Sequence, residues 1–203
     1  FMDTHHDLAV MLPNINPYIR PSGTSLEEWC DTKILEMEET ILSIGADQIG
    51  CFIAEPILAS GGVIVPPPGY HQRSIELCQE HDIIYISDET VTGFGRLGHW
   101  FASKEIFDIQ PDIITCAKGL TSGYLPMGAA IISDGLINGI KSTDGSQPFT
   151  NGYTYSCHPV AARAALTNID IISRDGILEH VREISPHFQN RLRDLGKKYD
   201  IRG

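Results

Sequence analysis

Three charged residues follow directly on strand-like, apolar segments of this sequence: Glu55, Asp88 and Lys118. In an open α/β sheet the carboxyl ends of parallel strands meet at one edge, and ligands bind in the crevice beside that edge. A charge next to a buried strand is costly unless it is paired or bound. A solvated loop explains any one of these residues, but all three together favour a single site with two carboxylates and one amine.

A glycine-rich run, Gly93-Phe94-Gly95-Arg96-Leu97-Gly98, lies between Asp88 and Lys118 and has the form G-x-G-x-x-G. In dinucleotide-binding folds this pattern closes a strand and opens a helix directly. Here the polar stretch 88–92 separates the run from its strand, and no helix cap follows Gly98. We therefore expect a loop and not a dinucleotide site.

Several other residues are weaker candidates for chemistry. His5 and His6 are adjacent, so their side chains point apart in a strand, and surface positions are expected for them. His158 precedes Pro159 and is interpreted as a neighbour of a helix start, not as a general base. The five cysteines are odd in number and form no C-x-x-C pair, which argues against disulfides and a zinc site. The motifs of serine hydrolases, zinc proteases and P-loop nucleotidases do not occur.

The elements that must position the three charged residues alternate between helix and strand, as in α/β domains with parallel strands. Ser25 and Glu28 form a capping box before a helix that extends to Ile44. Apolar spacing predicts further helices from residues 70, 159 and 175. Apolar runs predict four strands, at 49–54, 82–87, 113–116 and 127–133.

The composition of these strands predicts their places in the sheet. The first is apolar on both faces and should be a central, buried strand. The last follows the third by too few residues for a crossover helix and should be antiparallel. The predicted fold is therefore α/β, with a mostly parallel sheet and flanking helices.

The overall charge limits the partners of the chain. It carries 15 Lys and Arg against 26 Asp and Glu, a formal charge of −11. Phosphate backbones and anionic membranes would repel it, so neither nucleic acid nor a membrane is an expected partner. No apolar stretch approaches the roughly 20 residues of a membrane span, and the N-terminal residues lack the regions of a signal peptide. A cytoplasmic location follows by default.

Five segments of the chain, taken in order, resemble the motif series of class III pyridoxal-phosphate aminotransferases. They are Ala-Glu-Pro at 54–56, the Gly-Gly-Val segment at 61–67, Ser-Asp-Glu-Thr through Gly-Phe-Gly-Arg at 87–96, Ala-Lys-Gly through Pro-Met-Gly at 117–128, and Gly-Tyr-Thr-Tyr-Ser-Cys-His-Pro at 152–159. The resemblance covers essentially the whole chain and implies the large domain of fold-type I pyridoxal-phosphate enzymes.

The resemblance also implies a domain organisation. Members of the family are considerably longer, so we expect this chain to be a central fragment that is inactive by itself. Residues 1–175 would belong to the cofactor-binding large domain, without its N-terminal part and phosphate cup. Residues 176–203 would form a helix that leads into a truncated C-terminal small domain.

Two residues of the resemblance would carry the chemistry. Pyridoxal 5'-phosphate works as an electron sink while its ring nitrogen stays protonated, and a buried carboxylate beside that nitrogen keeps the proton there. Asp88 matches this carboxylate. Lys118 matches the lysine that forms the Schiff base and then carries a proton between the substrate and the cofactor.

Three further cofactor-binding positions follow from the same resemblance. Thr154 matches a threonine that reaches across a dimer interface to the phosphate in the other subunit. Thr90 stands where a residue packs on the cofactor ring and is commonly valine. Glu55 matches a glutamate that, in some relatives, pairs with a switching arginine. Cys157 departs from the pattern because it replaces a glycine of the motif.

The predicted activity is transfer of an amino group from an amine or ω-amino acid to a keto acid, such as pyruvate or 2-oxoglutarate, by a homodimer with shared sites. A pyridoxal-phosphate aminomutase or decarboxylase of the same fold is an alternative, because the same aspartate and lysine serve all three reactions. A non-catalytic fragment is a second alternative. The sequence does not specify the donor, the acceptor or the pathway.

Overall fold

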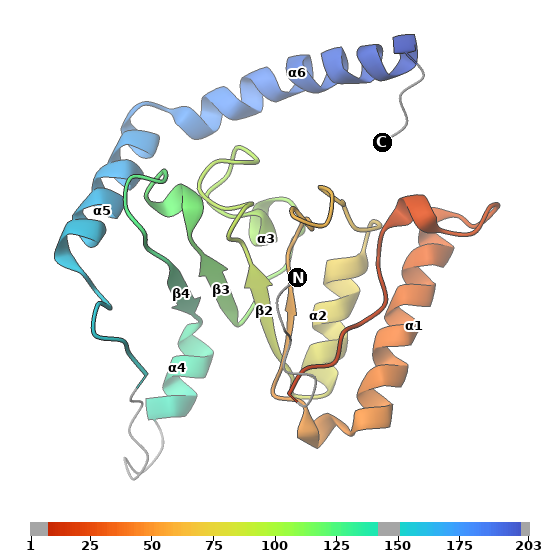
Figure 1. Ribbon diagram of the computed structural model, residues 1–203. Coiled ribbons are helices and arrows are strands. Elements are labelled where there is room, and N and C mark those ends of the chain that lie inside the picture. The colour runs from red at the N-terminus through yellow and green to blue at the C-terminus, as the bar shows by residue number, and fades with distance from the viewer. Residues whose placement is uncertain (1–7, 142–150, 200–203) are drawn as a thin grey trace.

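A four-stranded sheet in the order β1-β2-β3-β4 lies at the centre of the computed structural model, which describes residues 8–141 and 151–199 (Figure 1). The strands are β1 (Cys51–Ala54), β2 (Ile84–Asp88), β3 (Ile113–Cys116) and β4 (Ala129–Ile132). The first three are parallel, and β4 runs antiparallel to β3. The mostly parallel sheet and the reversed last strand confirm the sequence prediction. His5 and His6 lie outside the described residues.

The helices flank this sheet. They are α1 (Leu26–Ile44), α2 (Tyr70–Glu80), α3 (Ala102–Glu105), α4 (Asp134–Lys141), α5 (Pro159–Arg174) and α6 (Ile177–Tyr199), with single 3-10 turns η1 (Pro17–Ile19), η2 (Ala46–Gln48) and η3 (Lys118–Leu120). Figure 1 shows α1 and α2 side by side next to β1 and β2, α5 beyond β4, and α6 passing over the loops that follow β2 and β3. Among the described residues, no helix combines the length and the apolar character needed to span a bilayer.

Two helix starts match the sequence signals. The Ser25 hydroxyl accepts a hydrogen bond from the Glu28 amide at 3.1 Å, and the Glu28 carboxylate accepts one from the Ser25 amide at 2.7 Å, which completes the capping box. At the start of α5, the Nδ1 atom of His158 accepts a hydrogen bond from the Val160 amide at 3.3 Å. His158 is therefore the N-cap of α5, as its place before Pro159 indicated.

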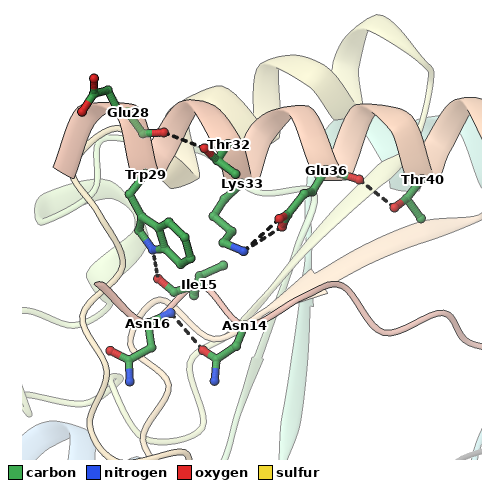
Figure 2. A network of polar contacts seen from close by, with 9 residues as sticks. All are labelled: Asn14, Ile15, Asn16, Glu28, Trp29, Thr32, Lys33, Glu36 and Thr40. Carbon is green, nitrogen blue, oxygen red and sulfur yellow. Dashed lines mark hydrogen bonds and ion pairs between the residues drawn. The ribbon is translucent and has the colours of Figure 1, made fainter. Parts of the chain in front are cut away.

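Figure 2 shows the hydrogen bond that joins the N-terminal segment to α1, together with polar contacts along the helix. The Trp29 indole donates to the Ile15 carbonyl at 3.1 Å. The Lys33 ammonium lies 4.2 Å from the Trp29 ring centroid and 2.8 Å from a Glu36 carboxylate oxygen, although its side chain is only 6% exposed. A lysine can be buried this far because both a carboxylate and an aromatic face compensate its charge.

The main core joins α1 and α2 to one face of the sheet. Its buried members are Met37, Ile41, Ile75, Leu77, Cys78, Ile83, Tyr85 and Ile109. Helix α2 contributes the middle of this cluster, so it separates α1 from the strands.

The prediction that β1 is central and buried is wrong for this chain. Strand β1 stands at the end of the sheet, and Cys51 and Ile53 are exposed, whereas Phe52 packs on the core against Tyr85 with ring centroids 5.3 Å apart. Successive residues of a strand face opposite sides. The described chain covers only the side that Phe52 faces, so the second apolar face of β1 has no cover within it.

Between α5 and α6 the chain turns at Gly176, which has φ +63°. The predicted domain boundary after residue 175 falls at this turn. The first turn of α6 packs back on the loop after β2, because Leu178 is buried and the Arg182 guanidinium donates to the Gly98 carbonyl. The division into two domains stays a prediction.

His71 is buried and neutral behind the sheet. Its Nε2 atom lies 3.0 Å from the Pro56 carbonyl, which can only accept, so Nε2 carries the hydrogen and Nδ1 accepts from the Tyr85 hydroxyl at 2.9 Å. Burial lowers the pKa of His71 below its ordinary value of 6.5. The same burial raises the pKa of Tyr85.

This histidine predicts a pH dependence of stability. Because the folded state binds the His71 proton more weakly than the unfolded chain, its contribution is complete above pH 6.5 and is lost as the pH falls below 6.5. The slope from this group reaches at most about 1.4 kcal/mol per pH unit. A glutamine amide can make both hydrogen bonds but does not titrate. In the intact protein that contains this chain, His71→Gln should therefore make the free energy of unfolding, measured with denaturant, less dependent on pH between 6.5 and 5. The exposed His180→Gln should not, and an unchanged profile in His71→Gln would contradict the assignment.

Candidate active site at the carboxyl edge of the sheet

The strand register brings the three charged residues to one edge of the sheet. Ala54 of β1 lies opposite Ser87 of β2, so Glu55 and Asp88 are level with each other. Asp88 in turn lies opposite Thr115 of β3. Lys118 follows Thr115 by three residues, in the turn η3 that ends β3.

Asp88 is half-buried and is fixed through one of its two carboxylate oxygens. Its Oδ1 atom accepts hydrogen bonds from the Thr115 hydroxyl at 3.1 Å and from the Thr90 amide at 3.0 Å. The second oxygen, Oδ2, accepts no hydrogen bond from any residue of the described chain. The orientation of the carboxylate is thereby set, while one oxygen remains available to a ligand.

Glu89, the next residue, is fully buried at 0% exposure and has all its partners within the fold. Its Oε1 atom accepts hydrogen bonds from the amide and hydroxyl of Ser103, and its Oε2 atom from the Ala102 amide and the Thr92 hydroxyl, all at 2.6–2.7 Å. The Ser103 hydroxyl also lies 2.8 Å from that of Ser87. This carboxylate therefore joins β2, the loop after it and α3.

The glycine-rich run 93–98 forms a closed loop between β2 and α3. The Phe94 amide donates to the Trp100 carbonyl at 2.7 Å, and the Gly95 amide to the His99 carbonyl at 3.0 Å. No helix opens directly from the run, which confirms the expectation of a loop.

Lys118 has a strained backbone, with φ +34°. For a residue other than glycine, such a conformation costs on the order of 1–3 kcal/mol and persists only where the surroundings enforce it. The next residue is packed tightly, because a Cβ atom at Gly119 would lie 2.8 Å from the Cβ of Phe94. Asn168 of α5 donates to the carbonyls of Gly119 and Leu120 at 2.8 and 3.2 Å.

A cavity of about 500 Å³ opens beside Lys118. Its walls are the loop at 93–96, Lys118 with Gly119, and one side of α6 that includes Val181, Ile184 and Phe188. Arg96 and Lys118 give it two cationic side chains. Asp88, Thr90 and Glu55 do not line this cavity, so the structure brings Lys118 alone among the predicted residues to its wall.

The remaining predicted residues are placed less closely together. The Glu55 carboxylate accepts a hydrogen bond from the Ala59 amide at 3.0 Å, and no arginine pairs with it in the described chain. Thr90 is partly buried and contacts Asp88 through its backbone. Thr154 lies exposed in the turn before α5, a segment that Figure 1 places beside β4 and away from β1. Cys157 in that turn has φ +58°, the conformation that favours glycine.

Comparison with known proteins identifies the family. The sequence profile of the class III aminotransferases matches residues 2–203. The chain belongs to the class III aminotransferase family. Its curated relatives include a probable aminotransferase of Mycobacterium tuberculosis, 42% identical over 195 residues that make up 95% of this chain and 41% of the relative. The putrescine–pyruvate aminotransferase of Pseudomonas aeruginosa is 44% identical over 161 residues, 79% of this chain and 34% of that enzyme.

A solved structure gives the same result for the fold. The (S)-enantioselective ω-transaminase of Thermomicrobium roseum superposes with a TM-score of 0.83 at 38% identity, over 91% of this chain and 40% of that protein. The chain thus spans about two fifths of the length of these family members or less. The predicted likeness to the large domain of fold-type I pyridoxal-phosphate enzymes is confirmed.

The residues present fit the cofactor of this family, pyridoxal phosphate. Asp88 offers a fixed, half-buried carboxylate with one available oxygen, which suits a protonated ring nitrogen. The Lys118 amine has no hydrogen bond or ion pair within the described part of the chain, which suits a covalent link to an aldehyde. Across residues 8–141 and 151–199, no three His, Cys, Asp or Glu side chains are grouped as metal ligands.

Sequence reasoning missed two residues of this region. Glu89 adjoins Asp88 and was not singled out, although a carboxylate inside a buried segment signals internal hydrogen bonds. Asn168 carried no signal, because its partners are 46–49 residues away in the chain.

Replacement of Glu89 should destabilise the fold strongly. Glu89→Ala would leave the amides of Ala102 and Ser103 and the Thr92 hydroxyl without their acceptor in the protein interior. In the intact protein we expect the free energy of unfolding to fall by several kcal/mol, because each buried donor left without an acceptor costs about 1–3 kcal/mol. Glu105 is exposed in α3, the helix whose first residues Glu89 binds. Glu105→Ala should change the free energy of unfolding by less than about 0.5 kcal/mol. Equal unfolding free energies for the two variants in urea would show that the buried network contributes little.

Proposed function

We propose that the protein containing this chain transfers an amino group from an amine or ω-amino acid to a 2-oxo acid, with pyridoxal phosphate bound at the edge formed by β2 and β3. The observation that carries the proposal is the pair Asp88 and Lys118, each at the end of neighbouring strands and each with a polar group unused by the fold. The activities named for the relatives in Pseudomonas aeruginosa and Thermomicrobium roseum support the same reaction class.

Two side chains of this chain have distinct tasks in the reaction. Bound pyridoxal phosphate supplies an electron sink for the reacting carbon. Asp88 Oδ2 would hold the proton on the ring nitrogen that this sink requires. Lys118 Nζ would hold the cofactor by its aldehyde, and the same amine would move a proton between the substrate and the cofactor. Such proton transfer by a placed side chain contributes roughly 10²–10⁴-fold to the rate.

Thr90 and Glu55 are proposed to support the cofactor site beside Asp88. The Thr90 amide donates a hydrogen bond to Asp88 Oδ1 at 3.0 Å, so Thr90 lies next to this carboxylate, and its side chain is proposed to contact the cofactor ring. Glu55 is level with Asp88 and is available to pair with a cation from outside the described chain.

A homodimer with shared sites is part of the proposal. Large aromatic side chains are exposed around the start of α5, where Tyr124, Tyr153 and Tyr155 are 82–85% exposed. Tyr124 and Val160 also line an apolar cavity of about 650 Å³ between η3 and α5. Exposed aromatic surface of this kind is typical of a protein interface. Thr154 lies on this surface, and we propose that it binds the cofactor phosphate of the partner subunit. The cytoplasmic location also remains a proposal.

Reduction with borohydride tests the site assignment directly. In the intact protein saturated with pyridoxal phosphate, peptide mapping should find the pyridoxyl group on Lys118, and Lys118→Ala should abolish turnover with an amine donor and pyruvate. A label on Lys104 or Lys141 in place of Lys118 would contradict the proposal. A label on Lys118 with loss of CO₂ from amino acids, or with internal amino migration, would instead favour the decarboxylase or aminomutase alternative.

Mixing two inactive variants tests the shared site. Thr154→Ala subunits keep Lys118, and Lys118→Ala subunits keep Thr154, so a mixed dimer has one complete site. If the two variants are mixed in equal amounts and their subunits exchange freely, about a quarter of wild-type activity should return. Half of the dimers are then mixed, and each mixed dimer has one complete site out of two. The matched control replaces Thr154→Ala with a Lys118→Ala, Thr154→Ala double variant, which should restore nothing. Full cofactor affinity in Thr154→Ala alone would contradict the role.

A further inference from the structure

Three hydrogen bonds attach α5 to the turn that carries Lys118. The Asn168 amide nitrogen donates to the carbonyls of Gly119 and Leu120, and its Oδ1 atom accepts from the Ser122 hydroxyl at 2.7 Å. The orientation of the amide is determined by its partners, because two carbonyl oxygens can only accept. Asn168 therefore uses both the nitrogen and the oxygen of its side-chain amide on three of the four residues that follow Lys118.

These bonds lie where the turn is strained. Lys118 and Ser122, at the two ends of the attached segment, have φ +34° and +49°. Within the segment, the Leu120 amide bonds to Ala117 and the Ser122 amide to Gly119, so the turn is closed on itself. Internal bonds of this kind fix the shape of the turn but not its position relative to the sheet.

Two contacts fix the position of the turn from outside. Phe94 packs against Gly119, where no Cβ atom would fit. From α5, Asn168 holds the carbonyls of the same residue and its neighbour. Packing against a phenylalanine resists approach but not withdrawal, whereas the hydrogen bonds of Asn168 resist withdrawal. The two contacts are thus complementary.

We propose that Asn168 is a positioning residue for Lys118, which keeps the strained turn in place so that the Lys118 amine stays at the edge beside Asp88. The inference rests on the proposed function, since it concerns the reactivity of Lys118 toward pyridoxal phosphate. It also couples α5, whose first residue follows the segment that carries the exposed Tyr153 and Tyr155, to the reactive lysine. A loss of Asn168 would leave the carbonyls of Gly119 and Leu120 without their donor and let the turn withdraw.

The test measures where pyridoxal phosphate adds, apart from turnover. The intact protein is freed of cofactor, exposed briefly to pyridoxal phosphate with borohydride, and mapped for the ratio of label on Lys118 to label on the exposed Lys104. We expect this ratio to fall at least tenfold in Asn168→Ala and in Asn168→Asp, which keeps the shape but puts an acceptor opposite the carbonyls. Ser122→Ala, which removes one partner but neither carbonyl bond, is the matched control and should stay within twofold of wild type.

Hydrogen exchange of the segment 118–124 in the same samples tests the attachment itself. Its amides should exchange at least tenfold faster in Asn168→Asp than in wild type, with the exchange of the β2 and β3 amides unchanged. An unaltered labelling ratio in a folded Asn168→Ala or Asn168→Asp protein would overturn the inference. If neither variant folds, exchange of 118–124 in the wild type at the rate of an unprotected loop would overturn it as well. Wild-type label on Lys104 in preference to Lys118 would instead contradict the proposed function.

Discussion

The carboxylate of Glu89 is the interaction on which the arrangement of the site depends. It accepts four hydrogen bonds in the protein interior, from one residue of the loop after β2 and two residues at the start of α3. A buried carboxylate is stable only when its hydrogen bonds are this complete. The loop cannot move away from β2 without breaking them. Asp88, the preceding residue, therefore leaves the sheet in a fixed direction.

The same loop supports the lysine on the neighbouring strand. Phe94 belongs to the segment that Glu89 fixes, and Phe94 packs on the residue after Lys118. The acidic and basic members of the site are thus held by one continuous set of contacts, which α5 completes through Asn168. A strained lysine backbone can persist there because both packing and hydrogen bonds hold the residues that follow it.

Much of this arrangement follows from local patterns in the sequence. The capping box at Ser25 and the short connection before β4 each depend on a few neighbouring residues, and each predicts the structure correctly. The patterns fail where the outcome depends on distant parts of the chain. The residues of β1 are apolar on both faces, yet what covers them is decided by other segments. Glu89 binds Ala102 and Ser103, 13 and 14 residues away, and Asn168 binds residues 46–49 away, so local spacing does not reveal these contacts.

The exposed face of β1 has a consequence for how the chain behaves in solution. A strand at the end of a sheet presents amide and carbonyl groups along its free side, and among the described strands none occupies that side of β1. With Ile53 57% exposed as well, such an edge is a template for intermolecular strand addition. During synthesis, chains could therefore associate through the free edge of β1 until another segment of polypeptide pairs with that strand.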